Sequence, residues 1–331
     1  MAQVQGVFWG ESRIFGYPMF DLNGVAPFTQ VTPTPNGSPL QLTSEGEWLV
    51  MGHSLVQCTS AAGGLANNTP VNLQVIRQDN GEQLVRLGPQ PTQAANLLVP
   101  MGAPIEHICG KAGNPGYLSY HWPVPSGTRL LPQIVHQAAA TPTGRSPFYM
   151  VAHALLDRGK DTAPIEIGSK EEQQNKYFGK WAAFTGRLNY SAANPLAINQ
   201  GDTLIIPINT TQYFFVSNLL CRAIELGSPN IMLPNDALNP LVQEDEILVS
   251  LKDTSNQSPF TTPGFVPLWS AFGNLMARDY HPPTMFVIRP RGSLEIDIQN
   301  GPTAAVQYAL EFTIEGILVD KPSDAIMEQL A

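Results

Sequence analysis

The sequence has little charge and few cysteines for its length. Only 14% of its 331 residues are Asp, Glu, Lys or Arg, whereas a typical globular chain has about 25%. The three cysteines, Cys58, Cys109 and Cys221, are far apart and form no Cys-x-x-Cys pair, which argues against a zinc ribbon or a thioredoxin-like site. We expect free buried thiols, which fits folding in a reducing cytoplasm. One disulfide with one free thiol is the alternative.

Basic runs and long apolar runs are also missing. The net charge is −9 and no Lys/Arg cluster occurs, so direct binding of nucleic acid is disfavoured. No stretch of about 18 apolar residues exists to form a transmembrane helix. The first five residues lack the basic and apolar regions of a signal peptide. We therefore expect a soluble protein that is synthesised in the cytoplasm.

Catalytic motifs are missing as well. Gly52-His53-Ser54 lacks the second glycine of a hydrolase elbow, and Gly110 to Gly113 matches neither glycine-rich phosphate loop. The six histidines show no His-x-His or His-x-x-x-His spacing. His153 and Asp157 could share a helix face, but a structural role is favoured. We predict no catalytic, cofactor-binding or metal-binding residues.

Four other groups have a functional interpretation beside a structural one. The acidic cluster Glu244–Glu246 could bind a divalent cation or form a solvated edge. Glu295 and Asp297 could be the carboxylate pair of a glycosidase or an ordinary exposed strand face. Tyr120 and Trp122 could stack on a sugar or anchor a loop. Arg289 and Arg291 could bind the carboxylates of a neighbouring subunit or lie in a solvated turn.

The sequence is rich in turn residues. It has 28 glycines and 30 prolines spread along the chain, which indicates many turns between many short strands. Its length suggests two domains, although one large β domain is allowed. Low charge is typical of surfaces that become buried in an interface. A secreted β protein with a neutral polar surface would have the same composition.

The strongest strand pattern is near the C-terminus, from Pro283 to Asp320. Leu294, Ile296 and Ile298 alternate with Glu295 and Asp297, which puts the aliphatic and the acidic side chains on opposite sheet faces. Two further apolar runs flank this strand across Gly/Pro/Asn turns. We interpret the block as an antiparallel meander with one solvated face.

Other segments give local predictions. Asn80-Gly81 between residues 72–77 and 83–87 predicts a β-hairpin, because both turn residues tolerate positive φ. Residues 146–157 form either a buried strand or a short helix. Residues 268–279 have apolar side chains at helical spacing and predict a short helix.

These patterns suggest a division of the chain. Residues 161–179 are polar and form the best boundary, or one exposed helix with Ser169 as its N-cap. The aromatic segment Val7 to Phe28 packs on its own sandwich or reaches a neighbouring subunit. We expect the following parts: 1–45 extended N-terminal arm, 46–168 first β-sandwich domain, 169–180 polar connector, 181–320 second β-sandwich domain, and 321–331 C-terminal tail.

The second half resembles bacteriophage virion structural proteins. The features that carry the resemblance are the strands Thr203–Val216 and Glu246–Leu251 and the segment Met285–Asn300, a strand, a Pro-containing turn and a second strand that ends in Asn. In that family such a unit closes a jelly-roll-like sandwich. The size of the chain and its two β-rich halves are also similar to double jelly-roll major capsid proteins.

The sequence thus predicts an all-β protein with two β-sandwich or jelly-roll-like domains, which could form a double jelly roll, and one or two short helices. The resemblance implies a self-assembling, non-enzymatic capsid or capsid-associated subunit located in the virion. Its partners would be copies of itself, as a trimer or a higher ring, and other virion proteins. The alternatives are a receptor- or carbohydrate-binding module and a polysaccharide hydrolase.

Overall fold

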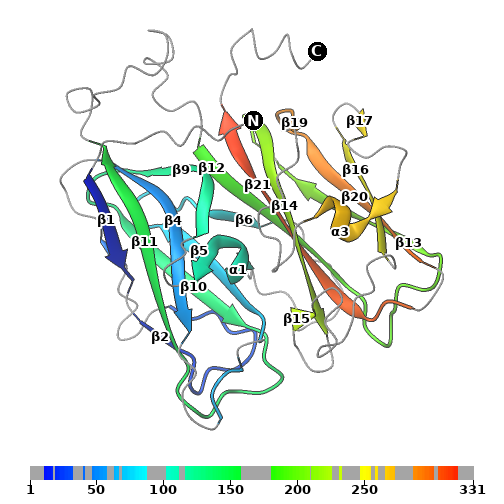
Figure 1. The fold of residues 1–331 in the computed structure, drawn as a ribbon, viewed down its shortest axis with the longest axis horizontal. Coiled ribbons are helices and arrows are strands. Elements are labelled where there is room, and N and C mark those ends of the chain that lie inside the picture. The colour runs from blue at the N-terminus through cyan, green and yellow to red at the C-terminus, as the bar shows by residue number, and fades with distance from the viewer. Residues whose placement is uncertain are drawn as a thin grey trace.

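The computed structural model describes residues 11–17, 19–32, 40–41, 47–57, 63–66, 69–87, 102–111, 116–157, 180–208, 210–225, 231–232, 247–254, 258–259, 265–272, 286–301 and 305–319. In this part of the chain the regular structure is β-strand apart from two four-residue helices (Figure 1). The expected all-β fold class is confirmed.

The first half of the chain forms two sheets, A and B. In sheet A, β1, β11 and β4 are neighbours, β2 also pairs with β11, and β8 and β9 pair with β4. Sheet B has the order β3-β10-β5-β7. The strands are β1 (Glu11–Gly16), β2 (Phe20–Asp21), β3 (Leu40–Gln41), β4 (Glu47–Gln57), β5 (Val71–Arg77), β7 (Ala103–Pro104), β8 (Cys109–Lys111), β9 (Gly116–Val124), β10 (Arg129–His136) and β11 (Pro147–Asp157).

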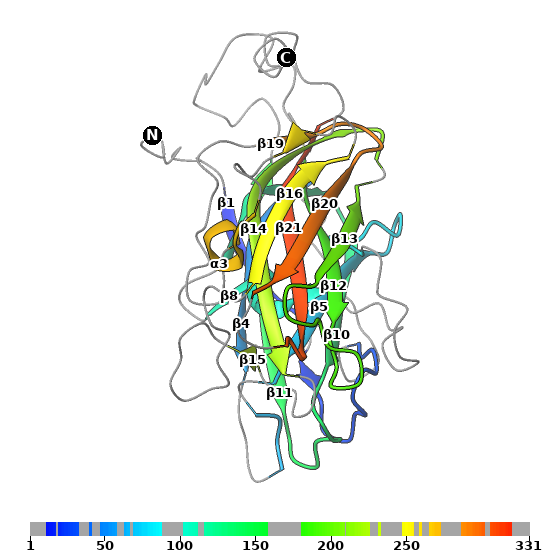
Figure 2. The ribbon, with the colours of Figure 1, turned by 90° about the vertical axis from the view of Figure 1, so that its right-hand side faces the viewer.

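The second half forms sheets C and F, which lie one behind the other (Figure 2). Sheet C has the order β15-β14-β21-β12-β6, with β19 also paired to β14. In sheet F, β13, β20 and β16 are neighbours, and β17 and β18 pair with β16. The strands are β6 (Val85–Leu87), β12 (Lys180–Asn189), β13 (Gly201–Pro207), β14 (Tyr213–Glu225), β15 (Ile231–Met232), β16 (Ile247–Asp253), β17 (Ser258–Pro259), β18 (Val266–Pro267), β19 (Phe286–Ile288), β20 (Ser293–Asn300) and β21 (Tyr308–Val319).

Both halves have the same strand order. Each half has eight principal strands, which we count in chain order. In one sheet the neighbouring strands are the first, eighth, third and sixth, and in the other sheet they are the second, seventh, fourth and fifth. The eight strands are β1, β3, β4, β5, β7, β9, β10 and β11 in the first half, and β12, β13, β14, β16, β18, β19, β20 and β21 in the second. This order is that of a jelly roll. The chain is therefore a tandem of two jelly rolls.

The meander predicted near the C-terminus is wrong. The strands β19 and β21 belong to sheet C, whereas β20, between them in sequence, belongs to sheet F. The alternation in β20 is nevertheless as predicted, because Leu294, Ile296 and Ile298 are buried and the residues between them are half-exposed. Periodicity fixes which face of a strand is buried but does not fix its partner strand.

Each sandwich encloses its own hydrophobic core, and sheet C is buried on both faces. One core lies between sheets C and F and contains Phe184, Phe214 and Phe312. The other fills the first sandwich around Trp48 and Trp122 and also includes Trp181 and Ala183 from β12. All twelve residues of β21 are buried. Sheet C therefore lies between sheet F and the first half of the chain.

The two helices occupy equivalent places in the two jelly rolls. Helix α1 (Ile105–Ile108) lies between β7 and β9, and α3 (Leu268–Ala271) lies between β18 and β19. Each helix is preceded by a proline. Cys109-Gly110 follows α1, and Phe272-Gly273 follows α3. The helix predicted for 268–279 thus has one described turn, and residues 273–279 lie outside the described part. Residues 147–157 are strand β11, so the helix alternative is wrong there.

The turn predicted at Asn80-Gly81 is present, but the strand after it changes sheet. The Gly81 amide donates to the Arg77 carbonyl at 2.9 Å, and Gly81 has a φ of 71°. Strand β6 then pairs in parallel with β12 of sheet C. The Gln74 side chain bonds to β6 where the backbone of β5 would do so in a continuous ladder. Its Oε1 accepts from the backbone N–H of Val85 at 3.0 Å, and its Nε2 donates to the backbone carbonyl of Val85.

The segment expected as an extended arm is built into the first jelly roll over its described residues. Strand β1 pairs with β11 along its whole length, and Tyr17, Phe20 and Leu22 are buried in the first core. The described aromatic residues Tyr17 and Phe20 thus pack on their own sandwich, whereas Phe8 and Trp9 lie outside the described part. Residues 161–179 and the tail 321–331 lie outside the described part, so the predicted domain boundaries stay a prediction.

Candidate functional site

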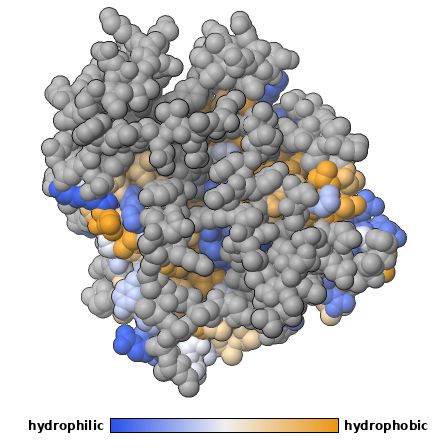
Figure 3. Space-filling model, in the orientation of Figure 1, coloured by the Kyte–Doolittle hydropathy of each residue, from blue (hydrophilic) through white to orange (hydrophobic). Residues whose placement is uncertain are grey.

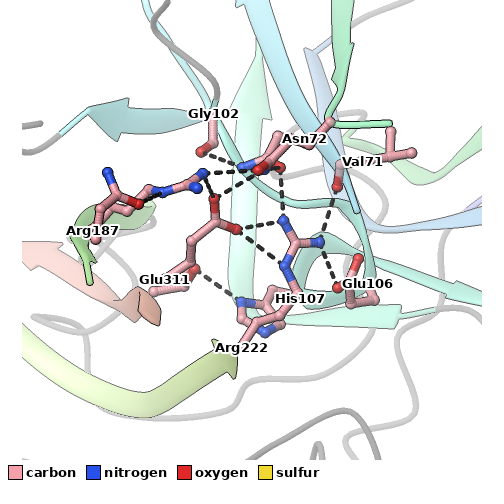
Figure 4. A network of polar contacts seen from close by, with 11 residues as sticks. Val71, Asn72, Gly102, Glu106, His107, Arg187, Arg222 and Glu311 are labelled. Atoms are coloured by element: carbon pink, nitrogen blue, oxygen red, sulfur yellow. Dashed lines mark hydrogen bonds and ion pairs between the residues drawn. The ribbon is translucent and has the colours of Figure 1, made fainter. Parts of the chain in front are cut away.

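The contact between the two jelly rolls contains a network of four ion-paired side chains, each buried or half-buried. Glu311 in β21 is the direct cross-strand neighbour of Arg187 in β12 and of Arg222 in β14. All three point away from the C–F core, toward the first half (Figure 4). Glu106 in α1 supplies the second carboxylate. Within this network the two positive and two negative charges balance, which favours their burial, whereas Glu315, buried on the same face of β21, accepts a hydrogen bond from Asn218.

The ion pairs are short and connect both halves of the chain. Arg187 Nη1 lies 2.6 Å from Glu311 Oε1, and Arg222 contacts Glu311 Oε2 through Nε at 3.0 Å and through Nη2. Arg222 Nη1 lies 2.6 Å from Glu106 Oε1 across the interface. The Arg222 side chain is fully buried, with 0% exposure. One residue of the second half thus links its own sheet to the first jelly roll.

Neutral groups of the first half add further hydrogen bonds to the network. Arg222 also donates to the Val71 carbonyl at 3.2 Å and to Asn72 Oδ1 at 2.7 Å. Gln137 donates to Asn72 and to Glu311, both at 3.0 Å, and accepts from Arg187 at 2.9 Å. His107 Nδ1 and Thr313 Oγ1, also at the interface, lie 2.9 Å apart. Val71, Asn72, His107 and Gln137 all belong to the first half.

The electrostatics keep the central carboxylate ionised. Burial by itself would raise the pKa of Glu311, but Arg222, Arg187 and the Gln137 hydrogen bond outweigh it and hold that pKa below its usual range. Burial likewise opposes the charged form of Arg222, yet Glu106 and Glu311 raise its pKa. The network therefore acts as a permanent ionic clamp between the jelly rolls at neutral pH.

The space beside the network is small. A cavity of about 10 Å³ is lined by residues that include Asn72, Thr185, Arg187 and Glu311. This volume holds about one water molecule and is far too small for an organic cofactor. We therefore interpret the network as a structural site that sets the position of one jelly roll against the other.

Sequence reasoning did not single out the network. The signal is the alternation of Glu311, Thr313 and Glu315 with Leu310, Phe312 and Ile314, which lies in the block that we interpret as a meander with one solvated face. In the structure this polar face is buried against the first half. The pairing of Glu311 with two arginines more than 80 residues away in sequence follows from the register of β12, β21 and β14.

The candidate residues from the sequence lie elsewhere. Trp122 is 1% exposed in the first core, so it cannot form the sugar-stacking platform, and the Tyr120 side chain lies outside the described set. Lys252 bridges Glu295 and Asp297 on the outer face of sheet F, and Thr203 donates to Asp297 at 2.7 Å. We therefore interpret the two carboxylates as a cross-strand ion-pair ladder.

The other candidates are scattered or lie outside the described residues. Arg289 and Arg291 are exposed in the β19–β20 turn, where Arg291 has a φ of 62°. His153 lies in a strand, so it shares no helix face with Asp157, and its Nε2 lies 3.0 Å from Ser54 Oγ. Cys221 is a free, buried thiol as expected, and Cys109 is buried with its Sγ 3.8 Å from Met150 Sδ. Residues 244–246 and Cys58 lie outside the described part.

The described residues contain neither a cluster of His, Cys, Asp and Glu metal ligands nor a membrane-spanning helix. Within them, no group of three or more His, Cys, Asp or Glu side chains is placed to hold a metal ion. No described helix has the length and apolar character needed to cross a membrane.

Comparisons with known proteins give weak similarities. No protein-family model matches the sequence, and no curated protein is significantly similar to it. Among solved structures, the STIV MCP matches at 9% identity over 96% of this chain and 99% of that chain, with a TM-score of 0.37. The infectious bursal disease virus Gx strain structure matches at 10% identity over 95% and 72%, with a TM-score of 0.23. TM-scores below 0.5 do not establish a common fold, so the assignment of two jelly rolls rests on the strand order.

Proposed function

We propose that this protein is a structural subunit of a virus particle, a capsid or capsid-associated protein. The observation that carries the proposal is the tandem of two jelly rolls with one strand order. Single jelly rolls occur in viral capsid proteins and also in lectins and cupins. A tandem pair is the arrangement of the double jelly-roll capsid proteins that the sequence resembles.

The contact between the jelly rolls supports a structural role. Sheet C is buried on both faces, and four balanced charges and several amides fix the register of the two halves. Buried polar groups that bind one another by hydrogen bonds favour one arrangement of the two halves over others. A shell needs subunits of constant shape, so a rigid contact of this kind suits a wall element.

The finer parts of the proposal follow from the resemblance. We infer that the particle is a bacteriophage, that the protein is synthesised in the host cytoplasm, and that its final location is the virion. Its partners are copies of itself and other virion proteins, and it does not act as an enzyme. The tail 321–331 remains the proposed terminal contact, whereas the described part of residues 1–45 belongs to the first jelly roll.

The mass of the purified protein tests the proposal. Light scattering, followed by negative-stain microscopy of the same sample, is expected to show a closed oligomer that grows into shells, sheets or tubes. A monomer at all concentrations and in all assembly conditions would overturn the proposal. In that case a glycan array would test the lectin-like function that jelly rolls also perform.

A further inference from the structure

The interior of the first jelly roll contains a cluster of two sulfur atoms, an imidazole and a phenol. Cys109 Sγ lies 3.8 Å from Met150 Sδ, and His53 Nε2 lies 3.2 Å from the Tyr17 hydroxyl. On the face of the molecule in Figure 3, exposed hydrophobic residues lie beside hydrophilic ones. The cluster lies beneath the surface, because each of its four side chains is at most 6% exposed.

The register of sheet A brings these residues together. Strand β4 lies between β11 and β8, and its residue His53 is directly opposite Ala152 of β11 and Cys109 of β8. Met150, two residues before Ala152, is on the same face of β11 and extends across β4 to reach Cys109. Tyr17 follows β1, and its backbone N–H donates to the Met150 carbonyl at 2.9 Å. The contact between the two sulfur atoms therefore crosses the strand that carries His53.

The corresponding place in the second jelly roll is filled by aromatic rings. Phe272 follows α3 as Cys109 follows α1, and Phe312 lies in β21, the strand equivalent to β11 of Met150. The rings of Phe272 and Phe312 pack edge to face, with their centroids 5.1 Å apart. Packing at this place of the fold therefore requires neither sulfur nor a buried imidazole.

The two sulfur atoms are spaced like two ligands of one metal ion. With metal–sulfur bonds of about 2.3 Å and tetrahedral to trigonal angles, two sulfur ligands lie about 3.8–4.0 Å apart, and Cys109 and Met150 are 3.8 Å apart. A thiolate and a thioether are soft ligands, which select Cu(I). Two sulfur atoms in simple contact have a similar spacing, so the third group of the cluster decides between the two interpretations.

That third group is the imidazole of His53. The His53 side chain is fully buried, and its Nδ1 has no hydrogen-bond partner within the described residues. A buried polar atom without a partner is costly and calls for an explanation. In the tautomer with the proton on Nε2, that N–H donates to the Tyr17 hydroxyl oxygen and leaves the Nδ1 lone pair for a ligand. Histidines that bind metals are commonly held in this way, through the other ring nitrogen.

We propose that Cys109, Met150 and His53 form a binding site for one Cu(I) ion inside the first jelly roll, with Tyr17 as the residue that orients the imidazole. On binding, the Cys109 thiol releases its proton to solvent and its thiolate binds the ion. Thiolate and Cu(I) together carry no net charge, which suits a buried place, whereas Zn²⁺ would leave one positive charge there. The ion joins β4, β8 and β11, and the site does not depend on the proposed function.

Titration of the full-length protein with Cu(I) without oxygen, against a chelator such as bathocuproine disulfonate, tests the site. The metal-free protein, prepared with the same chelator, is the reference state for every pH and stability measurement. One Cu(I) per chain should bind, should raise the midpoint of thermal unfolding, and should show sulfur and nitrogen neighbours in X-ray absorption. No binding, a spectrum without sulfur, or an equal rise of the midpoint with Zn²⁺ would overturn the proposal.

Matched variants show which residues bind the ion. Met150→Leu keeps the volume of the side chain and should lower the Cu(I) affinity at least about tenfold, and Cys109→Ala should abolish binding. Met51→Leu, at a half-buried methionine of β4, and Cys221→Ala, at a buried thiol of the second half, should leave the affinity unchanged. Circular dichroism shows whether each variant is folded. Unchanged affinity in folded Met150→Leu or Cys109→Ala protein would place the ion elsewhere and overturn the proposal.

Tyr17→Phe tests the positioning role, because it removes the hydroxyl group and keeps the ring. The variant should still bind one Cu(I), with an affinity about 10–100-fold lower, and the thermal midpoint of its metal-free form should change little. A lower midpoint of the metal-free form with unchanged Cu(I) affinity would show a purely structural role for Tyr17 and overturn its assignment.

Discussion

The carboxylate of Glu311 lies between the guanidinium groups of Arg187 and Arg222, and all three side chains are buried. Its neutral amide isostere would leave two buried cations with Glu106 as the one remaining counter-charge. Breaking a buried pair in this way costs much more than the pair contributes, because the leftover charge stays desolvated.

We predict that Glu311→Gln lowers the free energy of unfolding by about 3–5 kcal/mol, measured by urea denaturation at pH 7. The matched control is Glu295→Gln in the neighbouring sheet, where the carboxylate is paired with Lys252 on an outer face. Its effect should be a small fraction of that loss. Equal losses in the two variants would show that Glu311 is not a special position.

His53 gives a pH dependence with a defined sign. Burial, with a smaller effect of His153, lowers the pKa of His53 from 6.5 to about 3. Its Nε2 lies 3.2 Å from the Tyr17 hydroxyl, and its Nδ1 has no partner within the described residues. Between pH 6.5 and 3 the unfolded chain therefore binds a proton that the folded chain does not bind, so stability is lost as the pH falls.

We predict that this histidine contributes a slope of about 1.4 kcal/mol per pH unit in that range. His53→Gln should remove this contribution, so that its unfolding free energy depends less steeply on pH than that of the unmodified protein. Urea unfolding at several pH values between 7 and 4 measures the difference. Parallel curves would contradict the prediction.

At the scale of elements, strand β21 depends on a glycine. The β-bulge in β14 between Val216 and Asn218 brings the Phe215 carbonyl close to Gly316. A Cβ at Gly316 would lie 2.1 Å from that oxygen and 2.8 Å from the Phe214 ring. The opposing atom is backbone, so the sheet would have to move.

We predict that Gly316→Ala destabilises the protein by about 1–3 kcal/mol or more. The control is Gly16→Ala at the end of β1, where a Cβ meets nothing within 4 Å. That variant should be neutral in thermal unfolding. A neutral Gly316→Ala would mean that the β14 bulge can relax without cost.

The elements also show what the sequence could predict. The alternation in β20 and the turn at Gly81 depend on neighbouring residues, and both were predicted correctly. The sheet to which β6, β19 and β20 belong depends on partners far away in sequence, so local periodicity could not give it. The polar face of β21 was misread for the same reason, because alternation does not reveal whether solvent or a second domain covers that face.

At the scale of the whole molecule, the two jelly rolls share a sheet and an ionic clamp. Strand β6 of the first half completes sheet C, and Trp181 and Ala183 of β12 complete the first core. Each half therefore has apolar surface that is buried only when the other half is present. The sequence predicts two β-sandwich domains, but the identical strand order of the halves is visible only in their topology, since their shared turns and helices are too short to stand out in sequence.

We therefore predict one cooperative unfolding transition for the protein in calorimetry. Arg222→Ala removes the side chain that contacts Val71, Asn72, Glu106 and Glu311 together, and it should separate the trace into two transitions. Two transitions in the unmodified protein would show that the halves are energetically independent.

The parallel pairing of β6 with β12 also has a consequence for synthesis. Val85 is opposite Ala183, so among the described strands β6 has no sheet partner until the chain has grown by nearly a hundred residues. At about 5–20 residues per second, that takes on the order of 5–20 s after Val85 has been made. During this interval strand β6 of the nascent first half is unpaired, because β12 has not yet been synthesised. A chaperone or the ribosome surface could shield β6 during that time.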